Sequence, residues 1–308
     1  MIAPGDVQHL VCPRCRGGLG FEGSVAARLD TGVLRCHDCG VAWPVEDGLP
    51  SLYDEDAVRG SDRFMRLLYD HLAPLHDPAV QYTLPLFQVG SAADMRAGYL
   101  ARMALERLTP RSDGRPVRIL DIGVGTGADL PLVRRRLPPS LSGGLPGAAA
   151  EAVEIWGLDL SRGMLRICRD RLRRAGDRET RLLLADAHAL PFGDGVFDRV
   201  FHVGGIAGYR EPARALAEMA RVAVPGTPIV VVDEQLDRSR RQSLYHRLTF
   251  RLVTFYDPAP HCPVEHLPPG AVDVRAEQLN RFFYCLTFSM PGTGEITSAG
   301  GPASRARE

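Results

Sequence analysis

The chain has 308 residues, of which 45% are apolar and 24% are charged, a composition typical of a globular enzyme. Its formal net charge is zero, so no overall positive field attracts nucleic acid or an anionic membrane. All 37 basic residues are arginine, which excludes a phosphate-loop lysine, a Schiff-base lysine and a lysine general base. No apolar run approaches the roughly 18–20 residues of a membrane span, and the N-terminus lacks the pattern of a secretory signal. We therefore expect a cytoplasmic protein.

Four of the seven cysteines form two pairs near the N-terminus, Cys12 with Cys15 and Cys36 with Cys39. Two residues separate the members of each pair, and twenty residues separate the pairs. In an unsecreted chain this spacing predicts a structural zinc site with four thiolate ligands. Two disulfides or four free thiols are the alternatives. We expect metal removal to unfold residues 1–55 and to spare the rest.

Residues 42–52, AWPVEDGLPSL, follow the second cysteine pair. They resemble the corresponding segment of Trm112-like zinc ribbons, and this resemblance implies a structural or partner-binding module of a methyltransferase system. The module carries eight acidic residues against four arginines, which makes it a poor clamp for nucleic acid.

Residues 61–108 have a helical pattern that prolines at positions 74, 78 and 85 should interrupt. Within it, residues 69–77, YDHLAPLHD, resemble the start of the menaquinone and ubiquinone C-methylating enzymes, with His76 where that family usually has tyrosine. The resemblance implies a helical lid that covers the cofactor and brings Tyr69 to it. Plain packing of an amphipathic helix is the alternative.

The central motif is residues 117–127, VRILDIGVGTG, an apolar run followed by three alternating glycines. The run predicts a buried strand. Glycine has no Cβ, so the backbone turns tightly and lies close to a ligand. A helix expected at 128–137 presents free N–H groups that suit an anionic group such as a carboxylate. Strand, loop and helix together predict the floor of a cofactor site at the carboxyl edge of a sheet.

Strands and helices alternate after this motif, which predicts a parallel sheet with helices on both faces. We expect residues 138–150 to form a surface loop at the opposite edge from the cofactor, and the tail from residue 291 to be disordered. The predicted strands are 153–159, 181–186, 196–203, 228–234 and an antiparallel pair near 271–279 and 282–288, and the predicted helices are 162–174, 211–223 and a basic amphipathic helix at 239–255.

Four motifs, at residues 120–127, 158–161, 185–192 and 197–200, occur in an order that resembles the class I S-adenosylmethionine (SAM) methyltransferases. The resemblance spans about residues 110–290 and implies an α/β fold: a Rossmann-like, doubly wound, seven-stranded sheet behind a small zinc ribbon. We accordingly divide the chain into a ribbon (1–55), a helical lid or linker (56–110), a SAM-dependent methyltransferase domain (111–290) and a tail (291–308).

The same resemblance assigns roles to the strand ends. The glycines approach the methionine part of SAM, Asp159 holds the ribose hydroxyls, Asp186 faces the adenine amine, and Asp121 orients the glycine loop. The predicted cofactor contacts are Tyr69, Asp121, Gly123, Gly125, Gly127, Asp159, Leu160, Asp186 and Ala187. Each acid has a plainer alternative, which is to cap a helix.

A dinucleotide dehydrogenase is the main competing interpretation of the glycine loop. Its fingerprint is Gly-x-Gly-x-x-Gly with an acid about 20 residues onward. Here the glycines alternate strictly, and Asp159 lies 38 positions after Asp121. The acid at Asp186 has no place in that pattern, so the motifs favour a methyltransferase.

Methyl transfer needs an aligned acceptor and the exclusion of water, and a base where the acceptor must lose a proton. His202 and Tyr209 flank the loop after the fourth strand, where acceptors approach in this fold, and are the predicted catalytic residues. His202 lies within the strand, so packing against a helix is its alternative role.

The sequence therefore favours SAM-dependent methyl transfer to a small, fairly apolar molecule. The alternatives are an rRNA or tRNA base methyltransferase, which the acidic ribbon and the lack of lysine disfavour, and a non-catalytic partner-binding protein that docks through its ribbon. Nucleic acid is thus a less favoured partner, while peripheral contact with a membrane stays open. The sequence does not determine the oligomeric state.

Overall fold

The computed structural model describes residues 1–25, 28–86, 91–141, 152–257 and 259–292. One sheet runs through these residues in the strand order β1-β2-β3-β4-β7-β6-β5-β8-β9-β11-β10. Most of the loop predicted at 138–150 and most of the tail predicted from residue 291 lie outside the described residues.

The predicted doubly wound sheet is confirmed by seven of these strands. β7, β6, β5, β8 and β9 run parallel, and β11 lies antiparallel to both β9 and β10. Their bounds are β5 Val117–Ile122, β6 Val153–Asp159, β7 Arg181–Ala185, β8 Arg199–Val203, β9 Ile229–Glu234, β10 Val272–Gln278 and β11 Phe283–Ser289. Because β5 lies at the centre, the glycine loop that follows it opens at the middle of the carboxyl edge.

Six α-helices and five short 3-10 helices complete the described part of the chain. No helix there is both long and apolar enough to cross a membrane. The α-helices are α1 Gly60–Leu86, α2 Ala92–Arg102, α3 Leu130–Arg136, α4 Arg162–Arg174, α5 Pro212–Val222 and α6 Leu244–Val253, and the 3-10 helices are η1 Pro4–His9, η2 Glu55–Ala57, η3 Leu105–Arg107, η4 Ile206–Gly208 and η5 Val264–His266.

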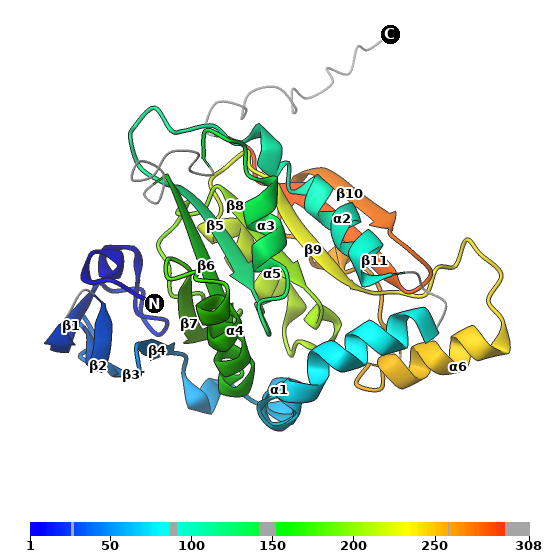
Figure 1. Cartoon of the computed structure of the whole chain (residues 1–308), viewed down its shortest axis with the longest axis horizontal. Helices are drawn as coiled ribbons and strands as arrows, with labels where there is room; N and C mark the ends of the chain where they lie inside the picture. The colour runs from blue at the N-terminus through cyan, green and yellow to red at the C-terminus, as the bar shows by residue number, and fades with distance from the viewer. Residues whose placement is uncertain (26–27, 87–90, 142–151, 258, 293–308) are drawn as a thin grey trace, which may run out of the picture.

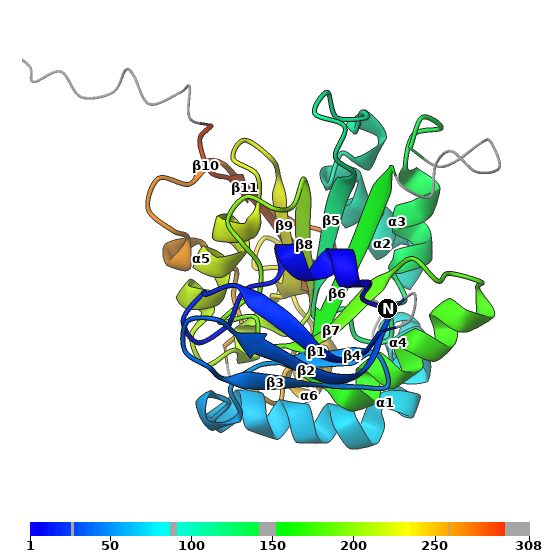
Figure 2. The ribbon, with the colours of Figure 1, turned by 90° about the vertical axis from the view of Figure 1, so that its left-hand side faces the viewer.

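Side chains of the central strand alternate between two hydrophobic clusters. Leu120 and Ile122 belong to the cluster that packs under α5, whereas Val117 and Ile119 belong to the cluster under α2, α3 and α4. Figure 2 shows α5 on one side of the sheet and these three helices on the other. Successive residues of a strand point to opposite faces, so an unbroken apolar strand requires cover on both.

The sheet has more strands than the seven expected, because the N-terminal ribbon joins it. The ribbon strands are β1 Leu19–Val25, β2 Leu29–Cys36, β3 Ala42–Glu46 and β4 Leu49–Leu52. β4 pairs in parallel with β7, with Ser51 opposite Leu184 and Leu52 opposite Ala185. β7 would otherwise be an edge strand with unpaired N–H and C=O groups, and β4 satisfies them.

The ribbon also shares its hydrophobic core with the larger sheet. Ile2, Leu34 and Trp43 of the ribbon lie in the same buried cluster as Trp156 and Phe192. A residue before β1, Leu10, forms an antiparallel bridge with Phe192. The expectation that residues 1–55 unfold without affecting the rest therefore needs revision.

The expected interruption of the helix at the prolines is wrong, because α1 runs continuously from Gly60 through Pro74 and Pro78. A proline inside a helix costs about 3 kcal/mol or more. Two carboxylates of α1, Asp70 and Asp77, form hydrogen bonds with the loop after β5 and the start of α4. Such charged hydrogen bonds contribute about 1.5–3 kcal/mol each, so they offset part of that cost.

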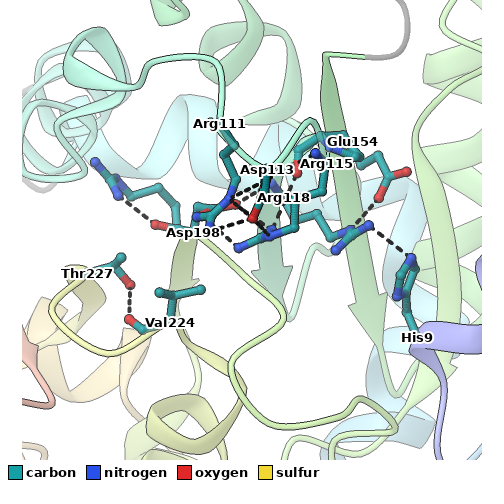
Figure 3. Close-up of polar contacts among 11 residues, drawn as sticks. His9, Arg111, Asp113, Arg115, Arg118, Glu154, Asp198, Val224 and Thr227 are labelled. Carbon is teal, nitrogen blue, oxygen red and sulfur yellow. Dashed lines mark hydrogen bonds and ion pairs between the residues drawn. The ribbon is translucent and has the colours of Figure 1, made fainter. Parts of the chain in front are cut away.

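An ion-pair network closes the amino ends of β5, β6 and β8 (Figure 3). The carboxylate of Asp198 accepts hydrogen bonds from Arg111 at 2.6 Å, from Arg115 at 3.2 Å and from the backbone N–H of Arg118 at 2.9 Å. The Arg118 guanidinium extends the network to Glu154 at 2.7 Å. Asp198, part of the fourth sequence motif, therefore supports the edge opposite the glycine loop.

Candidate functional site

A cavity of about 440 Å³ lies at the carboxyl ends of β5, β6, β7, β8 and β9. The glycine loop and three acids form one part of its wall, and aromatic and aliphatic side chains form another. α1, α2, the end of α6 with the segment that follows it, and the start of β11 also contribute to the wall. Polar and apolar linings thus meet in one continuous space.

The glycine loop has the backbone conformations for which glycine is needed. Gly123, Gly125 and Gly127 have φ angles of +70°, +52° and +72°, in the left-handed region that other residues rarely adopt. A Cβ atom on Gly127 would also lie 2.6 Å from the sulfur of Cys168. The loop therefore depends on glycine both for its turns and for its approach to α4.

Asp159, at the end of β6, binds this loop directly. Its Oδ2 accepts a hydrogen bond from the N–H of Gly125 at 2.9 Å, and its Oδ1 accepts one from the N–H of Ser161 at 2.7 Å. Burial raises the pKa of Asp159 to about 6, although both hydrogen bonds oppose the shift. Asp159 and Leu160 both line the cavity, and the contact of Asp159 with the ribose stays a prediction. Each carboxylate oxygen accepts more than one hydrogen bond, so capacity for a ligand hydroxyl remains.

Asp121 ends β5 on the cavity wall and is buried, yet no hydrogen bond or ion pair to it is seen among the described residues. Burial raises its pKa well above the usual range, and the nearby charges of Asp129 and Asp159 add to the shift. A buried polar group without a partner is costly. A cationic ligand group would remove that cost.

Asp186 lies at the cavity wall, but its carboxylate is already engaged by the protein. Its Oδ1 accepts hydrogen bonds from the backbone N–H of His188 at 2.9 Å and from the ring at 2.7 Å, and its Oδ2 accepts one from Arg210 at 2.7 Å. Burial alone would raise its pKa, but these partners outweigh burial and hold the pKa at about 2. Arg210 also pairs with Asp62 of α1. Contact of Asp186 or the adjacent Ala187 with adenine stays a prediction.

His202 does not face the cavity. Its buried ring lies below the glycine loop, where Nδ1 donates to the carbonyl of Ile122 at 2.8 Å and a Cβ on Gly123 would approach the ring to 3.3 Å. Burial lowers its pKa. The packed role that the sequence left open therefore describes His202 better than a catalytic base.

Tyr209 does line the cavity, with its ring 5.3 Å from that of His202 and 5.1 Å from that of His188. Burial raises its pKa well above the usual value for tyrosine. Its hydroxyl is therefore kept as a neutral phenol that can donate a hydrogen bond.

The two aspartates of the motif at residues 69–77 hold α1 over the site, a function that the sequence did not reveal. Asp70 accepts from the hydroxyl of Ser161 at 2.7 Å and from the N–H of Gly163 at 2.9 Å. Asp77 accepts from the hydroxyl of Thr126 at 2.7 Å and pairs with Arg171. Their seven-residue spacing, two helical turns, was the available signal.

His76 and Tyr69 complete this face of α1. A hydrogen bond from His76 is the main cause of the lowered pKa of Asp77. Both His76 and Tyr69 line the cavity. The resemblance implied such a covering helix, and its contacts now explain how the helix is held.

Glu234 is a site residue that the sequence did not single out. It ends β9 at the cavity wall, where its Oε2 accepts a hydrogen bond from the hydroxyl of Tyr256 at 2.7 Å. Burial and the neighbouring Asp233 raise its pKa well above the usual range for glutamate. Asp233 itself binds the backbone N–H groups of Gly205 and Ala207. The apolar cavity wall around Glu234 is formed by Val80, Val253, Phe255, Phe282 and Phe283.

The four ribbon cysteines come together as the spacing predicted. The sulfur atoms of Cys12, Cys15, Cys36 and Cys39 all lie within 4.8 Å of one another. The Cys12–Cys39 and Cys15–Cys36 sulfur pairs are 3.7 Å and 3.4 Å apart, too far for a disulfide bond of about 2.0 Å. Four convergent thiols in this arrangement fit tetrahedral zinc.

Removing the metal is expected to unfold the ribbon and also to loosen β7. The reason is that β4 covers the edge of β7 and the ribbon core continues into the larger sheet. Hydrogen exchange after chelation should show lost protection in residues 1–52 and in 181–185, while β5 and β8 stay protected. Unchanged protection of β7 would show that the ribbon unfolds independently after all.

Two family models match the chain. Residues 120–231 match the model described as "Methyltransferase domain", and residues 9–48 match "Trm112p-like protein".

Curated relatives match part of the chain. The demethylmenaquinone methyltransferase of Thermus thermophilus is 38% identical over 138 residues, which are 45% of this chain and 56% of that protein. The ubiquinone/menaquinone biosynthesis C-methyltransferase UbiE of Burkholderia mallei is 38% identical over 116 residues, which are 38% of this chain and 42% of that protein. The chain therefore spans about half the length of these relatives.

Solved structures show the same fold at low sequence identity. The phosphoethanolamine N-methyltransferase 2 of Haemonchus contortus, in complex with SAM, has a TM-score of 0.55 at 15% identity and covers 93% of this chain and 71% of its own. A putative SAM-dependent methyltransferase of Methanococcus maripaludis has a TM-score of 0.50 at 14% identity, and the match covers 74% of this chain and 95% of that protein. The chain thus has the fold of the class I, SAM-dependent methyltransferases, with residues 120–231 matching a methyltransferase-domain model and residues 9–48 a Trm112p-like model.

Proposed function

We propose that this protein transfers a methyl group from SAM to a small, apolar acceptor. The observation that carries the proposal is the cavity of about 440 Å³, which joins the acidic glycine-loop floor to an apolar, aromatic wall. A cofactor at the floor and an acceptor against the wall would share one space from which water is displaced.

The residues present fit SAM. Its ammonium and sulfonium groups are cationic, and the unpartnered carboxyl of Asp121 and the charge of Asp159 lie on the cavity wall. Gly123 and Gly125 would hold the methionine part, Asp159 and Leu160 the ribose, and Asp186 and Ala187 the adenine side, with Tyr69 covering the cofactor. Gly127 packs against Cys168 and does not line the cavity, so its role would be to shape the loop. When bound, SAM supplies an electrophilic methyl group on its sulfonium.

The chain's own contribution is to align the acceptor and to remove its proton. Asp70 and Asp77 hold α1 over the cavity, which keeps bulk water out. Glu234 is the base that the geometry favours over His202, because it reaches the cavity, and burial together with Asp233 raises its pKa. Tyr256 orients its carboxylate.

A ring with an ionisable hydroxyl is the acceptor type that suits these walls. Phenylalanine side chains offer flat apolar contact, and Glu234 with Tyr256 offers one polar end. Two relatives are named for methylating demethylmenaquinone or precursors of ubiquinone and menaquinone. A demethylated quinol is therefore the first acceptor to test.

Incubation with methyl-labelled SAM tests the proposal directly. The protein is added to cell extract and, separately, to demethylmenaquinol, and label is counted in organic-soluble molecules, RNA and protein. Label in the organic-soluble fraction is the expected result. Label in RNA would favour the base-methyltransferase alternative, and absence of SAM binding by calorimetry would favour the non-catalytic one.

The location and the domain limits are further parts of the proposal. A cytoplasmic protein with limits at residues 55, 110 and 290 is what we propose. Cell fractionation and limited proteolysis test these two points.

A further inference from the structure

The outward face of α6 is apolar, which reverses the usual pattern of a surface helix. Leu244, Leu248 and Leu252 follow one another at four-residue spacing and are 72%, 62% and 68% exposed. The buried side of the same helix carries His246 and Thr249 as well as Phe250. A helix of a globular protein normally buries its apolar stripe.

A second exposed apolar stripe runs along α1. Its members are Phe64, Leu67, Leu75, Tyr82 and Leu86, which share one helical face. The two helices meet where the hydroxyl of Tyr245 donates to the carbonyl of Leu86 at 2.6 Å, and both lie along the lower edge of the molecule in Figure 1. We call these two stripes, together with Phe255, the apolar face. Exposed apolar surfaces of this extent mark protein or membrane contacts.

Arginines outnumber acidic residues beside α6, where Asp237 pairs with Arg240 and Asp257 follows Phe255. Residues 238–253 contain five arginines and no acidic residue. The three acids of α1 point into the molecule, where Asp62 pairs with Arg210, Asp70 with Ser161, and Asp77 with Thr126. Apolar side chains bordered by arginine complement an anionic lipid surface. The apolar side chains enter the acyl region, and the arginines bind the headgroups.

The apolar face is continuous with the cavity. Val80 of α1 and Val253 of α6 line the cavity, while their neighbours Tyr82 and Leu252 are exposed. Phe255 lines the cavity and is itself 59% exposed. One side of α1 and α6 therefore lines the cavity, and the other side forms the apolar face.

We infer that α1 and α6 dock onto an anionic lipid bilayer, and that the acceptor is a lipid-soluble molecule that enters the cavity from that surface. The second part rests on the proposed function, whereas the docking does not. Docking also gives the exposed leucines an apolar environment without a protein partner.

Vesicle sedimentation tests the docking. The full-length, zinc-loaded protein is mixed with vesicles of 30% phosphatidylglycerol in phosphatidylcholine, and with phosphatidylcholine alone. We expect binding to the anionic vesicles that weakens with added salt. The triple variant Leu244→Ser, Leu248→Ser, Leu252→Ser should bind at least tenfold more weakly. The matched control Val272→Ser, Val274→Ser, which replaces exposed valines of β10, should bind like the wild type.

The role of the arginines has its own variant. Arg241→Gln with Arg247→Gln should lower affinity for the anionic vesicles severalfold and reduce the salt dependence. Circular dichroism and calorimetric SAM affinity, measured on every variant, establish that fold and cofactor site are intact. These readouts also separate the two hypotheses: SAM binding without vesicle binding overturns docking alone, and vesicle binding without SAM binding overturns the proposed function alone.

Two further outcomes would overturn the docking. One is equal vesicle binding by the triple variant and the valine control. The other is a wild-type dimer in light scattering that becomes a monomer in the triple variant, with no lipid binding by either, because the apolar face would then be an interface between two copies of the chain.

Discussion

Replacing Asp159 by alanine is expected to lower the affinity for SAM by about 100-fold or more. In the proposed complex its carboxylate holds two ribose hydroxyls, and two charged hydrogen bonds at about 1.5 kcal/mol each correspond to about 3 kcal/mol, or two powers of ten. The substitution also releases the N–H groups of Gly125 and Ser161, which loosens the glycine loop. Isothermal calorimetry with SAM measures the effect.

Glu154→Ala is the matched control, because Glu154 lies on the same strand as Asp159 but at its other end. It loses ion pairs to Arg118 at 2.7 Å and to Arg181 at 3.2 Å, so the melting temperature should fall while SAM affinity stays within about twofold of the wild type. If Asp159→Ala bound SAM as tightly as this control, the assignment of the cofactor site would be wrong.

The pH dependence of SAM binding provides a second check on Asp159. Because burial raises its pKa to about 6, acidification through pH 6 protonates the carboxylate and removes acceptor capacity. Affinity should therefore fall as the pH is lowered from 7 to 5. Asp159→Asn has no group titrating there and should lose most of this dependence.

Replacing Glu234 by glutamine is expected to slow methyl transfer by about 100- to 1,000-fold, within the range that a general base contributes. SAM affinity should hardly change, since Glu234 lies at the acceptor part of the cavity. In the wild type the rate should rise with pH through the raised pKa of Glu234, because only the carboxylate accepts a proton. Label transfer from SAM to demethylmenaquinol, followed from pH 5 to 9, measures the loss of rate and the pH dependence of the rate.

Tyr256→Phe is the companion variant. The tyrosine hydroxyl lowers the pKa of Glu234 through its hydrogen bond, so losing it should move the rise in rate to higher pH while leaving the maximal rate close to that of the wild type. A Glu234→Gln variant with full activity would show that Glu234 is not the base. Tyr209, the other predicted catalytic residue that lines the cavity, would then be the next residue to test.

Much of the fold could be predicted because its signals are local. The apolar run that ends at Ile122 and the strand at 153–159 appear in the structure as expected. Alternating glycines permit left-handed turns, and Gly123, Gly125 and Gly127 all adopt them in the structure. The cysteine spacing likewise limited the geometry of the ribbon.

Other features depend on contacts between distant residues. The pairing of β4 with β7 joins residues more than 130 positions apart, and the residues of neither strand indicate which strand it pairs with. Asp70 and Asp77 lie in a segment that the sequence singled out, but only the fold placed their partners Ser161 and Thr126 beside them. The continuity of α1 through two prolines has the same origin, because tertiary hydrogen bonds outweigh a local preference.

The sequence by itself determined which segments after residue 117 form strands and helices, and it determined the glycine loop, the acid at the end of β6 and the four-cysteine cluster. Each of these features is encoded by residues close together in the chain. Only the tertiary structure decided which acids line the cavity and which side of α6 faces solvent. Glu234 reaches the cavity and His202 does not, because strand position and burial, not residue type, set a side chain's access to a ligand. The leucines of α6 have the spacing of a stripe that is usually buried, yet they are exposed. Spacing alone does not reveal this, because burial depends on whether another part of the chain covers the helix.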